Sequence, residues 1–354
     1  MTTISRYLAV QVLIGLAIAT AILLPLFSFL DLLDQLHDVG KGTYQVKDAF
    51  LSTALLLPRR FIQLAPFVAL IGNVIALGRL AVGSELTVLR AAGVSPVRIS
   101  LVPIAIGLIL LVFNLLLDQF IAAQLQQQAI STRAAALEKS ASLGKELGIW
   151  TRDERNILRI GEMLHAGKAA DIEVMHFDDN GFLQTYIHAK YADFIDGDLW
   201  KLSDVVTKTF TGNRIESVNT DSLEWKSFLN PDDISTLTKP PESLSPIELF
   251  QHVRFLRATG QEADAYALAL WRKAGGALTT IAMLLFSIPF VFGSVRTGLA
   301  NRLVLASMLG MSVYLFDQIF ANAGLLLRMN PALVALSPGL MLIGIASLWL
   351  RRIF

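Results

Sequence analysis

The chain has no cysteine among its 354 residues, which excludes disulfide bonds, thiol catalysis and thiolate metal sites. Charge is also scarce. Lysine, arginine, aspartate and glutamate make up 17% of the sequence, and the net charge of +1 comes without the run of basic residues that is typical of nucleic-acid binding. The five histidines do not cluster with carboxylates. The sequence therefore predicts no metal site, no cofactor and no nucleic-acid partner.

Signatures of ATP or hydrolase chemistry are missing as well. The only segment near the phosphate-binding pattern Gly-x-x-x-x-Gly-Lys-Ser/Thr is Gly40-Lys41-Gly42, where a glycine follows the lysine and the earlier glycine is absent. No Ser/His/Asp arrangement occurs at the end of an apolar stretch. We expect this chain not to be an enzyme.

Long apolar stretches are what the sequence does have, and they account for much of its 54% hydrophobic content. Each is about as long as the ~20 residues that a helix needs to cross ~30 Å of hydrocarbon. Three precede and three follow a polar segment. The six predicted spans are Leu8–Leu30, Phe61–Gly78, Val97–Leu117, Ala274–Phe292, Leu303–Phe320 and Ala332–Leu350.

The polar segment between the two groups of spans alternates apolar and polar residues, as strands do. Turn sequences at Asp178–Gly181, Asp196-Gly197 and Gly212-Asn213 predict antiparallel hairpins. Gln124–Lys139 is expected to continue the third span as a helix, and Ile247–Thr259 to form an amphipathic helix that returns to the membrane. An antiparallel meander needs a second sheet or closure to bury its apolar face, so a sandwich or jelly roll is expected.

The predicted fold class is thus an α-helical membrane protein with six transmembrane helices, arranged 3+3, and an inserted all-β domain. The expected divisions are residues 1–120, 121–267 and 268–354. With both termini in the cytoplasm, eight basic residues lie in or beside the short inner loops and five on the other side. Because positive charge near the spans favours the cytoplasm, we expect the β domain to be periplasmic.

The loop between the second and third spans contains the sharpest local pattern. Ser84 is a good helix N-cap, Glu85 follows where the helix dipole favours an anion, and Leu86 and Arg90 have helical spacing before Gly93 ends the turn. Residues 83–95 therefore predict a short amphipathic helix. It could rest on lipid headgroups, or it could dock on a cytosolic partner with Glu85 paired to a basic residue.

Four segments together resemble one family, the LptF/LptG permeases that export lipopolysaccharide from the bacterial inner membrane, and the G branch more than the F branch. These segments are Ser84–Ser95, Asp34-Gln35-Leu36 with Gly42-Thr43-Tyr44, Ala189–Leu202 and Asp317–Phe320. The resemblance covers essentially the whole chain. It implies a permease subunit of an ABC-type exporter, six helices and a periplasmic β-jelly roll. The implied partners are an LptF-like second permease, a dimer of an LptB-like cytosolic ATPase, a bitopic LptC-like protein and lipopolysaccharide itself.

The resemblance also implies roles for individual residues. Glu85 matches the coupling glutamate of the family, on a helix that includes Ser84, Leu86 and Arg90. A lipid path would be apolar inside the bilayer and basic at its outer rim, although ordinary lipid-facing packing and headgroup contact are the alternatives for each residue. The candidate lipid-binding residues are Phe27, His37, Lys41, Arg59, Arg60, Arg133, Phe316, Asp317 and Phe320.

One departure from the family falls on this rim. The best-known G subunits carry a lysine pair just after Asp-Gln-Leu, whereas this sequence has His37-Asp38, with Lys41 a few residues later. Two more acidic residues lie at the ends of spans. Asp118 is expected at the membrane interface, and Asp317 is expected either near a lateral opening or paired to a neighbouring helix.

The strands supply an apolar row along which acyl chains could slide, although the same residues could simply form the core of the domain. Its candidate members are Ile172, Val174, Phe177, Tyr186 and Ile187. Two other functions remain open: a membrane scaffold with a periplasmic protein-binding domain, and a permease for lipoprotein or another lipid.

Overall fold

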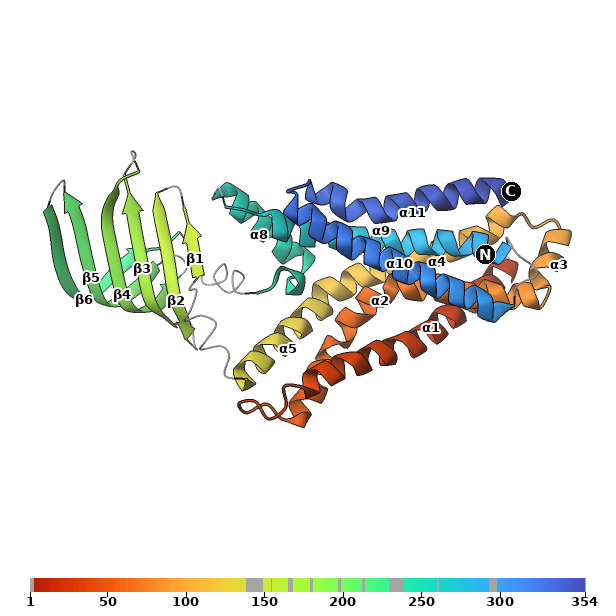
Figure 1. The fold of residues 1–354 in the computed structure, drawn as a ribbon, viewed down its shortest axis with the longest axis horizontal. Coiled ribbons are helices and arrows are strands. Elements are labelled where there is room, and N and C mark those ends of the chain that lie inside the picture. Colours follow the sequence, from red (N-terminus) through yellow and green to blue (C-terminus); the bar gives the residue numbers. More distant parts are fainter. Residues whose placement is uncertain are drawn as a thin grey trace.

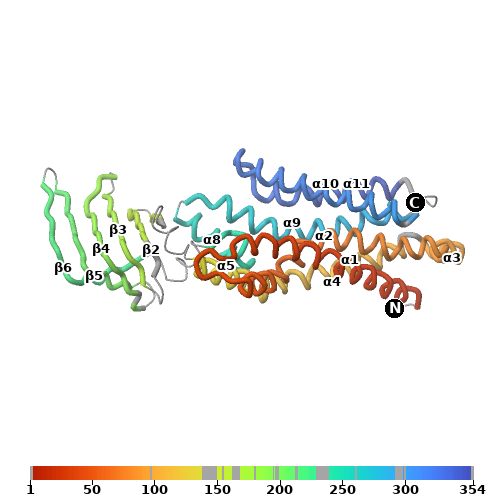
Figure 2. The backbone as a smooth tube through the Cα atoms, turned by 60° about the horizontal axis from the view of Figure 1, so that its bottom comes forward, coloured from red at the N-terminus to blue at the C-terminus, as the bar shows by residue number. Residues whose placement is uncertain are grey.

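A helical bundle and a β domain lie at opposite ends of an elongated molecule (Figure 1). The helix after the second span, α3 (Glu85–Ala91), and both chain termini lie together at the end far from the sheet (Figure 2). We call that end the α3 end and the opposite end the β-domain end. The computed structural model describes residues 3–137, 149–153, 155–164, 168–178, 181–196, 199–211, 214–228, 239–259, 261–292 and 298–353.

Six helices among these residues are long and apolar enough to cross a membrane, which confirms the predicted number and order of spans. They extend beyond the apolar stretches at their ends because flanking polar residues continue the helices. The third runs through a π-helical turn, η1 (Asp118–Ala122), into α5 (Ala123–Ala136). The predicted continuation is confirmed as far as Ala136, and residues 138 and 139 lie outside the described residues. The six are α1 (Thr3–Leu36), α2 (Val46–Val82), α4 (Pro96–Leu117), α9 (Asp264–Phe292), α10 (Leu299–Leu326) and α11 (Pro331–Ile353).

α2 and α9 form the centre of the bundle, and each belongs to a different half of the chain. Most of the apolar window of α2 and more than half of that of α9 are buried, whereas α1 and α10 are largely exposed. Asn73 of α2 donates a hydrogen bond to Ser287 of α9 at 2.6 Å, and both residues are fully buried. An amide buried among helices needs such a partner, so this bond fixes the contact between the halves.

Small residues allow two pairs of helices to approach closely. A Cβ atom added at Gly15 of α1 would lie 2.2 Å from the carbonyl oxygen of Gly72 in α2. One added at Gly275 of α9 would lie 2.2 Å from the carbonyl oxygen of Ala335 in α11. Backbones that touch at glycine gain packing contacts that larger side chains would prevent.

Six strands form one antiparallel sheet in sequential order, as the hairpin signals predicted. The predicted turn residues 179, 180, 197, 212 and 213 lie outside the described residues. The described strands make a single sheet, so the all-β domain is confirmed while the sandwich or jelly-roll form is not. The strands are β1 (Ile149–Arg152), β2 (Asn156–Leu164), β3 (Lys168–Phe177), β4 (Leu183–Asp196), β5 (Leu199–Thr211) and β6 (Arg214–Lys226).

A row of irregular positions crosses the sheet and lets one face remain apolar along the whole strands. In β3 the buried residues Ala169 and Ile172 are three apart, with the exposed Asp171 between them. In β5 the buried Leu202 and Val205 are likewise three apart, around Asp204. Regular strands bury every second residue, so the alternation slips by one residue here. Neighbouring strands slip at facing positions, with Asp171 between the pairs Ala170–Tyr191 and Ile172–Ala189, so the pairing register does not shift. Both aspartates have positive φ, 56° and 59°.

The helix α8 (Pro246–Ala258) connects the sheet to the bundle and matches the predicted amphipathic helix. Ser245 and Glu248 form a capping box at its start. Phe255 packs against the buried cluster of the sheet. After α8, the side-chain amide of Gln261 donates to Thr151 Oγ1 at 3.1 Å and to the Arg152 carbonyl at 3.0 Å, which fastens the edge strand β1 to the start of α9.

Candidate functional site

The helix α3 (Glu85–Ala91) follows α2 after a short turn and lies at the tip of the α3 end (Figures 1 and 2). Leu86 is its buried residue and joins the core cluster that also contains Leu8, Leu80 and Ile99. The opposite side is exposed, and Val88 is 65% accessible. The predicted amphipathic helix is therefore present, anchored by one leucine.

The prediction that Ser84 caps this helix through its side chain is wrong. Ser84 occupies the N-cap position but has φ of 61°, in the left-handed region, and its hydroxyl makes no capping hydrogen bond. The cause is the short connection from α2, where the chain changes direction within two residues after Val82. The predicted stop is correct: Gly93 has φ of 83°, and Val94 N–H donates to the Leu89 carbonyl at 3.0 Å.

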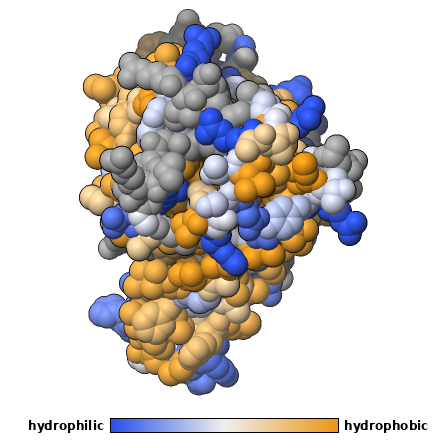
Figure 3. Space-filling view, turned by 90° about the vertical axis from the view of Figure 1, so that its right-hand side faces the viewer, coloured by the Kyte–Doolittle hydropathy of each residue, from blue (hydrophilic) through white to orange (hydrophobic). Residues whose placement is uncertain are grey.

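Glu85 has a partner that the sequence did not suggest. Tyr7 Oη, near the start of α1, donates a hydrogen bond to Glu85 Oε2 at 2.7 Å across 78 positions of sequence. Both side chains are exposed at the α3 end. Viewed from this end, hydrophilic side chains gather over part of the surface while the side of α1 is mostly hydrophobic (Figure 3). A carboxylate among exposed apolar and basic residues can accept charge-assisted bonds from a docked protein.

At the β-domain end, Lys41 and Arg133 converge on Asp38 in the turn between α1 and α2. Lys41 Nζ lies 2.8 Å from Asp38 Oδ1, and Arg133 Nη2 of α5 donates to Asp38 Oδ2. Hydrogen bonds from Arg133 and Lys41 hold the pKa of Asp38 well below its usual value. His37 is exposed beside them. The structure thus brings three predicted rim residues together around a carboxylate.

The segments Asp34-Gln35-Leu36 and Gly42-Thr43-Tyr44 meet in the same turn. Tyr44 is buried, and its hydroxyl donates to Gln35 Oε1 at 2.8 Å. Thr43 N–H donates to the Ala136 carbonyl at 2.8 Å, which holds the turn against the end of α5. A Cβ at Gly42 would lie 2.5 Å from that oxygen. The residues of these two segments therefore determine how the turn between α1 and α2 packs against the end of α5.

Arg59 does not reach outward. Its Nη1 lies 3.2 Å from Asp118 Oδ1, and Lys273 Nζ of α9 lies 2.5 Å from Asp118 Oδ2. Asp118 lies in the π-helical turn η1 and is buried in the protein, where it pairs with residues of α2 and α9. π-Helical turns are frequent at functional sites. Sequence reasoning missed Lys273, although a lysine only one residue before a predicted span is a recognisable signal.

The other predicted charged residues are also paired across helices. Arg60 of α2 binds Asp31 of α1, with Nε to Oδ2 at 2.7 Å and a second bond from Nη2. Asp317 of α10 accepts from Arg272 of α9 at 2.6 Å, which matches the pairing alternative for this residue. The side chains of these four residues remain partly exposed.

The aromatic candidates lie on the least buried helices. Phe316 and Phe320 stack on α10 with ring centroids 5.6 Å apart. Phe27 of α1 packs partly against the core beside exposed neighbours such as Phe29. The exposed apolar faces of α1 and α10 suit lipid or another helical protein.

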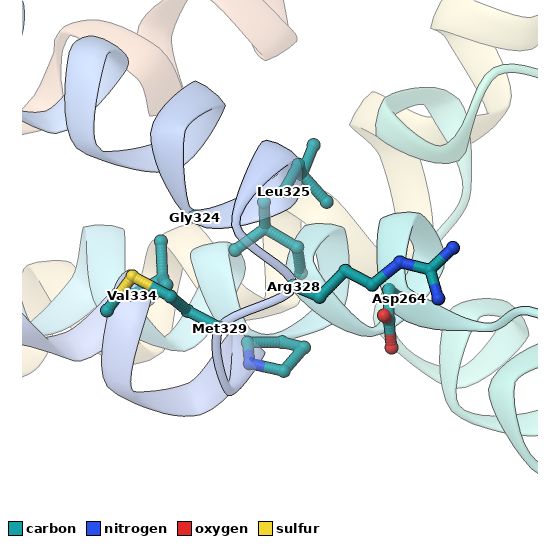
Figure 4. A pocket seen from close by; sticks show the side chains of 8 residues that line it. Asp264, Gly324, Leu325, Arg328, Met329 and Val334 are labelled. Atoms are coloured by element: carbon teal, nitrogen blue, oxygen red, sulfur yellow. The ribbon is translucent and has the colours of Figure 1, made fainter.

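A cavity with room for about one water molecule lies where α9 meets the turn between α10 and α11. Figure 4 shows Arg328 reaching from this turn past Asp264, and its guanidinium pairs with Glu262 at 2.9 Å. The cavity is too small for a lipid or a cofactor.

Within the sheet, the predicted apolar row is only partly correct. Ile172 and Val174 are buried, and Val174 is the register partner of Ile187. Tyr186 precedes Ile187 and faces the opposite side, where Lys208 lies 5.8 Å from its ring. Two successive strand residues cannot share a face, so assigning Tyr186 to this row was wrong. Phe177 is half-buried beyond a register shift.

Comparison with known proteins agrees with this architecture. The family "Lipopolysaccharide export system permease LptF/LptG" matches residues 6–352. The chain is 30% identical to the lipopolysaccharide export system permease protein LptG of Haemophilus influenzae over 343 residues, 96% of each chain. It is also 30% identical to LptG of Escherichia coli K12 over 346 residues, which are 95% of this chain and 96% of the relative. The chain belongs to the LptF/LptG family of lipopolysaccharide export permeases.

Proposed function

We propose that this chain is the LptG-like permease subunit of an ABC-type exporter. It takes lipopolysaccharide from the outer leaflet of the inner membrane and passes it to a periplasmic bridge, while a separate cytosolic ATPase hydrolyses ATP. The observation that carries this proposal is the placement of α3. An exposed helix with a carboxylate at its start lies at the opposite end of the molecule from the β domain, where an ATPase could act without blocking lipid exit.

The arrangement also supports an orientation with both termini in the cytoplasm and the β domain in the periplasm. The N-terminus, the C-terminus and α3 share one end, as six spans require. Residues 1–120 and 268–354 then form two transmembrane halves, joined through Asn73 and Ser287. The exposed apolar faces of α1 and α10 support contact with an LptF-like subunit and with acyl chains, and an LptC-like protein would continue the path.

The roles of individual residues follow from their positions. Glu85, with Ser84, Leu86 and Arg90 around it, is the proposed contact with an LptB-like ATPase. Lys41, Arg133 and His37 surround Asp38 at the β-domain end and are the proposed contacts for lipid phosphates. Arg59, Arg60 and Asp317 are tied to other helices, and their proposed role is to hold the walls of the lipid path. Phe27, Phe316 and Phe320 are proposed to line it.

The test is a purification in mild detergent at native expression, with the bound proteins and lipid identified by mass spectrometry. The wild-type chain should retain a second six-span permease, a small ATPase and lipopolysaccharide. Glu85→Arg should lose the ATPase alone, because it places a cation where a basic partner is expected. A matched control is Glu262→Arg at the other end of the molecule, which should keep all partners.

Two outcomes would contradict the proposal. Recovery of the chain with periplasmic proteins only would support the scaffold function instead. Recovery of an ATPase with a different lipid would support a permease for another substrate.

A further inference from the structure

The position of Glu85 depends on contacts outside its own helix. α3 has seven residues, too few for a helix that is stable by itself in water. Ser84 does not cap it, and Leu86 is its buried anchor. The hydrogen bond from Tyr7 is therefore a main constraint on where the Glu85 carboxylate points. Its length of 2.7 Å is typical of a charge-assisted bond.

Tyr7 belongs to a different transmembrane helix from the one that leads into α3. α1 is one helix from Thr3 to Leu36, with Pro25 inside it, so ~36 Å of helix separates Tyr7 from Asp31 near the β-domain end. Between them, α1 crosses α2 in close contact at Gly15. A displacement of Glu85 would thus act on the long, largely exposed helix α1 as well as on α2.

We propose that Tyr7 is a positioning residue that ties the Glu85 carboxylate to α1 and passes motion of α3 to this helix. The inference rests on the proposed function, because it assumes that an ATPase acts on α3. One Glu85 oxygen, Oε2, is engaged by Tyr7, which leaves Oε1 for the docked partner. The carboxylate then bridges the ATPase and α1.

The alternative path for motion of α3 is the backbone, since α3 is joined to α2 through Gly83 and Ser84. If this connection carried all the motion, the Tyr7 hydroxyl would contribute nothing. Removing only that hydroxyl separates the two routes. Tyr7→Phe keeps the ring and its packing, and because the side chain is exposed, the folded protein should be retained.

The experiment uses the complete complex reconstituted in proteoliposomes, with lipopolysaccharide released per ATP hydrolysed as the measured ratio. Tyr7→Phe should lower this ratio several-fold while ATPase co-purification and the melting temperature stay at wild-type values. Tyr191→Phe, which removes the hydroxyl of an exposed tyrosine on the β domain, is the matched control and should leave the ratio unchanged.

A double-mutant cycle shows whether Tyr7 acts through Glu85. In a Glu85→Ala background, where no side-chain oxygen remains to accept the bond, Tyr7→Phe should have no further effect on the ratio. A wild-type ratio for Tyr7→Phe, or an equal loss in both backgrounds, would overturn the inference. If Glu85→Ala itself kept the wild-type ratio, the proposed coupling role of α3 would be at fault instead, so the two failures are distinguishable.

Discussion

Lys273 Nζ lies 2.5 Å from Asp118 Oδ2 inside the helical bundle, although 155 positions of sequence separate the two residues. The side chains are 8% and 4% exposed. Arg59 approaches the other oxygen of the same carboxylate. One anion therefore pairs with two cations, and it joins α2 and η1 of the first half to α9 of the second half. Like the hydrogen bond between Asn73 and Ser287, this cluster connects the two halves of the chain through buried polar groups.

Removing the carboxylate should be much more damaging than removing the lysine. Asp118→Ala leaves two cations buried together without a partner, and breaking a buried pair from one side costs about 3–5 kcal/mol. Lys273→Met keeps the volume and leaves a balanced pair of Arg59 and Asp118. We expect a large fall in apparent melting temperature and folded yield in detergent for Asp118→Ala, and a small change for Lys273→Met.

An exposed pair provides the control for this comparison. Glu262 and Arg328 have side chains that are 83% and 77% exposed, and such pairs contribute roughly 0–1 kcal/mol. Glu262→Gln should therefore melt like the wild type. If Asp118→Ala did the same, the cluster would not stabilise the contact between the halves.

Much of the fold was predictable because the signals are local. An apolar stretch of about 20 residues needs no knowledge of its neighbours to indicate a span, and alternation with turn residues indicates a hairpin in the same way. The partner of Asp118 was not predictable, because Lys273 is close only after six helices have packed. The positive φ values of Asp171 and Asp204 were equally hidden, since nothing in the sequence around them marks a row of irregular positions across the sheet.

The candidate site around α3 also has features that the sequence predicts and features that it does not. Glu85 and the stop at Gly93 follow from the pattern of one helix. The hydrogen bond from Tyr7 depends on how α1 crosses α2, which is set by Gly15 and Gly72 within apolar stretches that carry no signal of the crossing. The failure of Ser84 as a cap has a similar cause, because the direction of α2 dictates its left-handed conformation.

The crossing of α1 and α2 should not tolerate even one added methyl group. Gly15→Ala places a Cβ against the Gly72 carbonyl, so the helices must separate and lose packing along their length. We expect a lower apparent melting temperature. At Gly276 of α9 a Cβ would meet nothing within 4 Å, so Gly276→Ala should be neutral or stabilise by up to about 1 kcal/mol. Equal melting temperatures for the two variants would contradict the close crossing.

Asp38 should compete with lipid phosphates for Lys41 and Arg133. Asp38→Asn keeps the size of the side chain but releases both cations, so binding of fluorescent lipopolysaccharide to the purified complex should tighten about two- to fivefold, as expected for a partly exposed ion pair. Asp34→Asn removes the same charge from an exposed neighbour and serves as the control. Tighter binding by both variants would indicate a general charge effect rather than release of these two residues.

The Asp38 carboxylate should also make the stability of the turn between α1 and α2 sensitive to acid. Because Arg133 and Lys41 lower the pKa of Asp38 in the folded protein, the pairing stabilises the fold above the unfolded pKa of about 3.9 and is lost as pH falls toward the folded value. Between pH 5 and pH 3 the apparent melting temperature of the wild type should fall more steeply than that of Asp38→Asn. Parallel curves would show that the pairing does not contribute to stability.

Glycine should relieve backbone strain to the benefit of the sheet at Asp204 and not at Asp171. Asp204 has φ of 59°, and its side chain is 72% exposed with Lys190 no closer than 4.0 Å, so Asp204→Gly removes backbone strain at little loss. Asp171 has φ of 56° but accepts hydrogen bonds from His188 and Arg159, which Asp171→Gly would lose. Hydrogen exchange of β4 and β5 in the intact protein should therefore slow in Asp204→Gly and quicken in Asp171→Gly. Because a β-branched residue at positive φ is strongly disfavoured, Asp204→Val should quicken exchange as well, and equal protection in the valine and glycine variants would show that this backbone geometry does not limit the stability of the sheet.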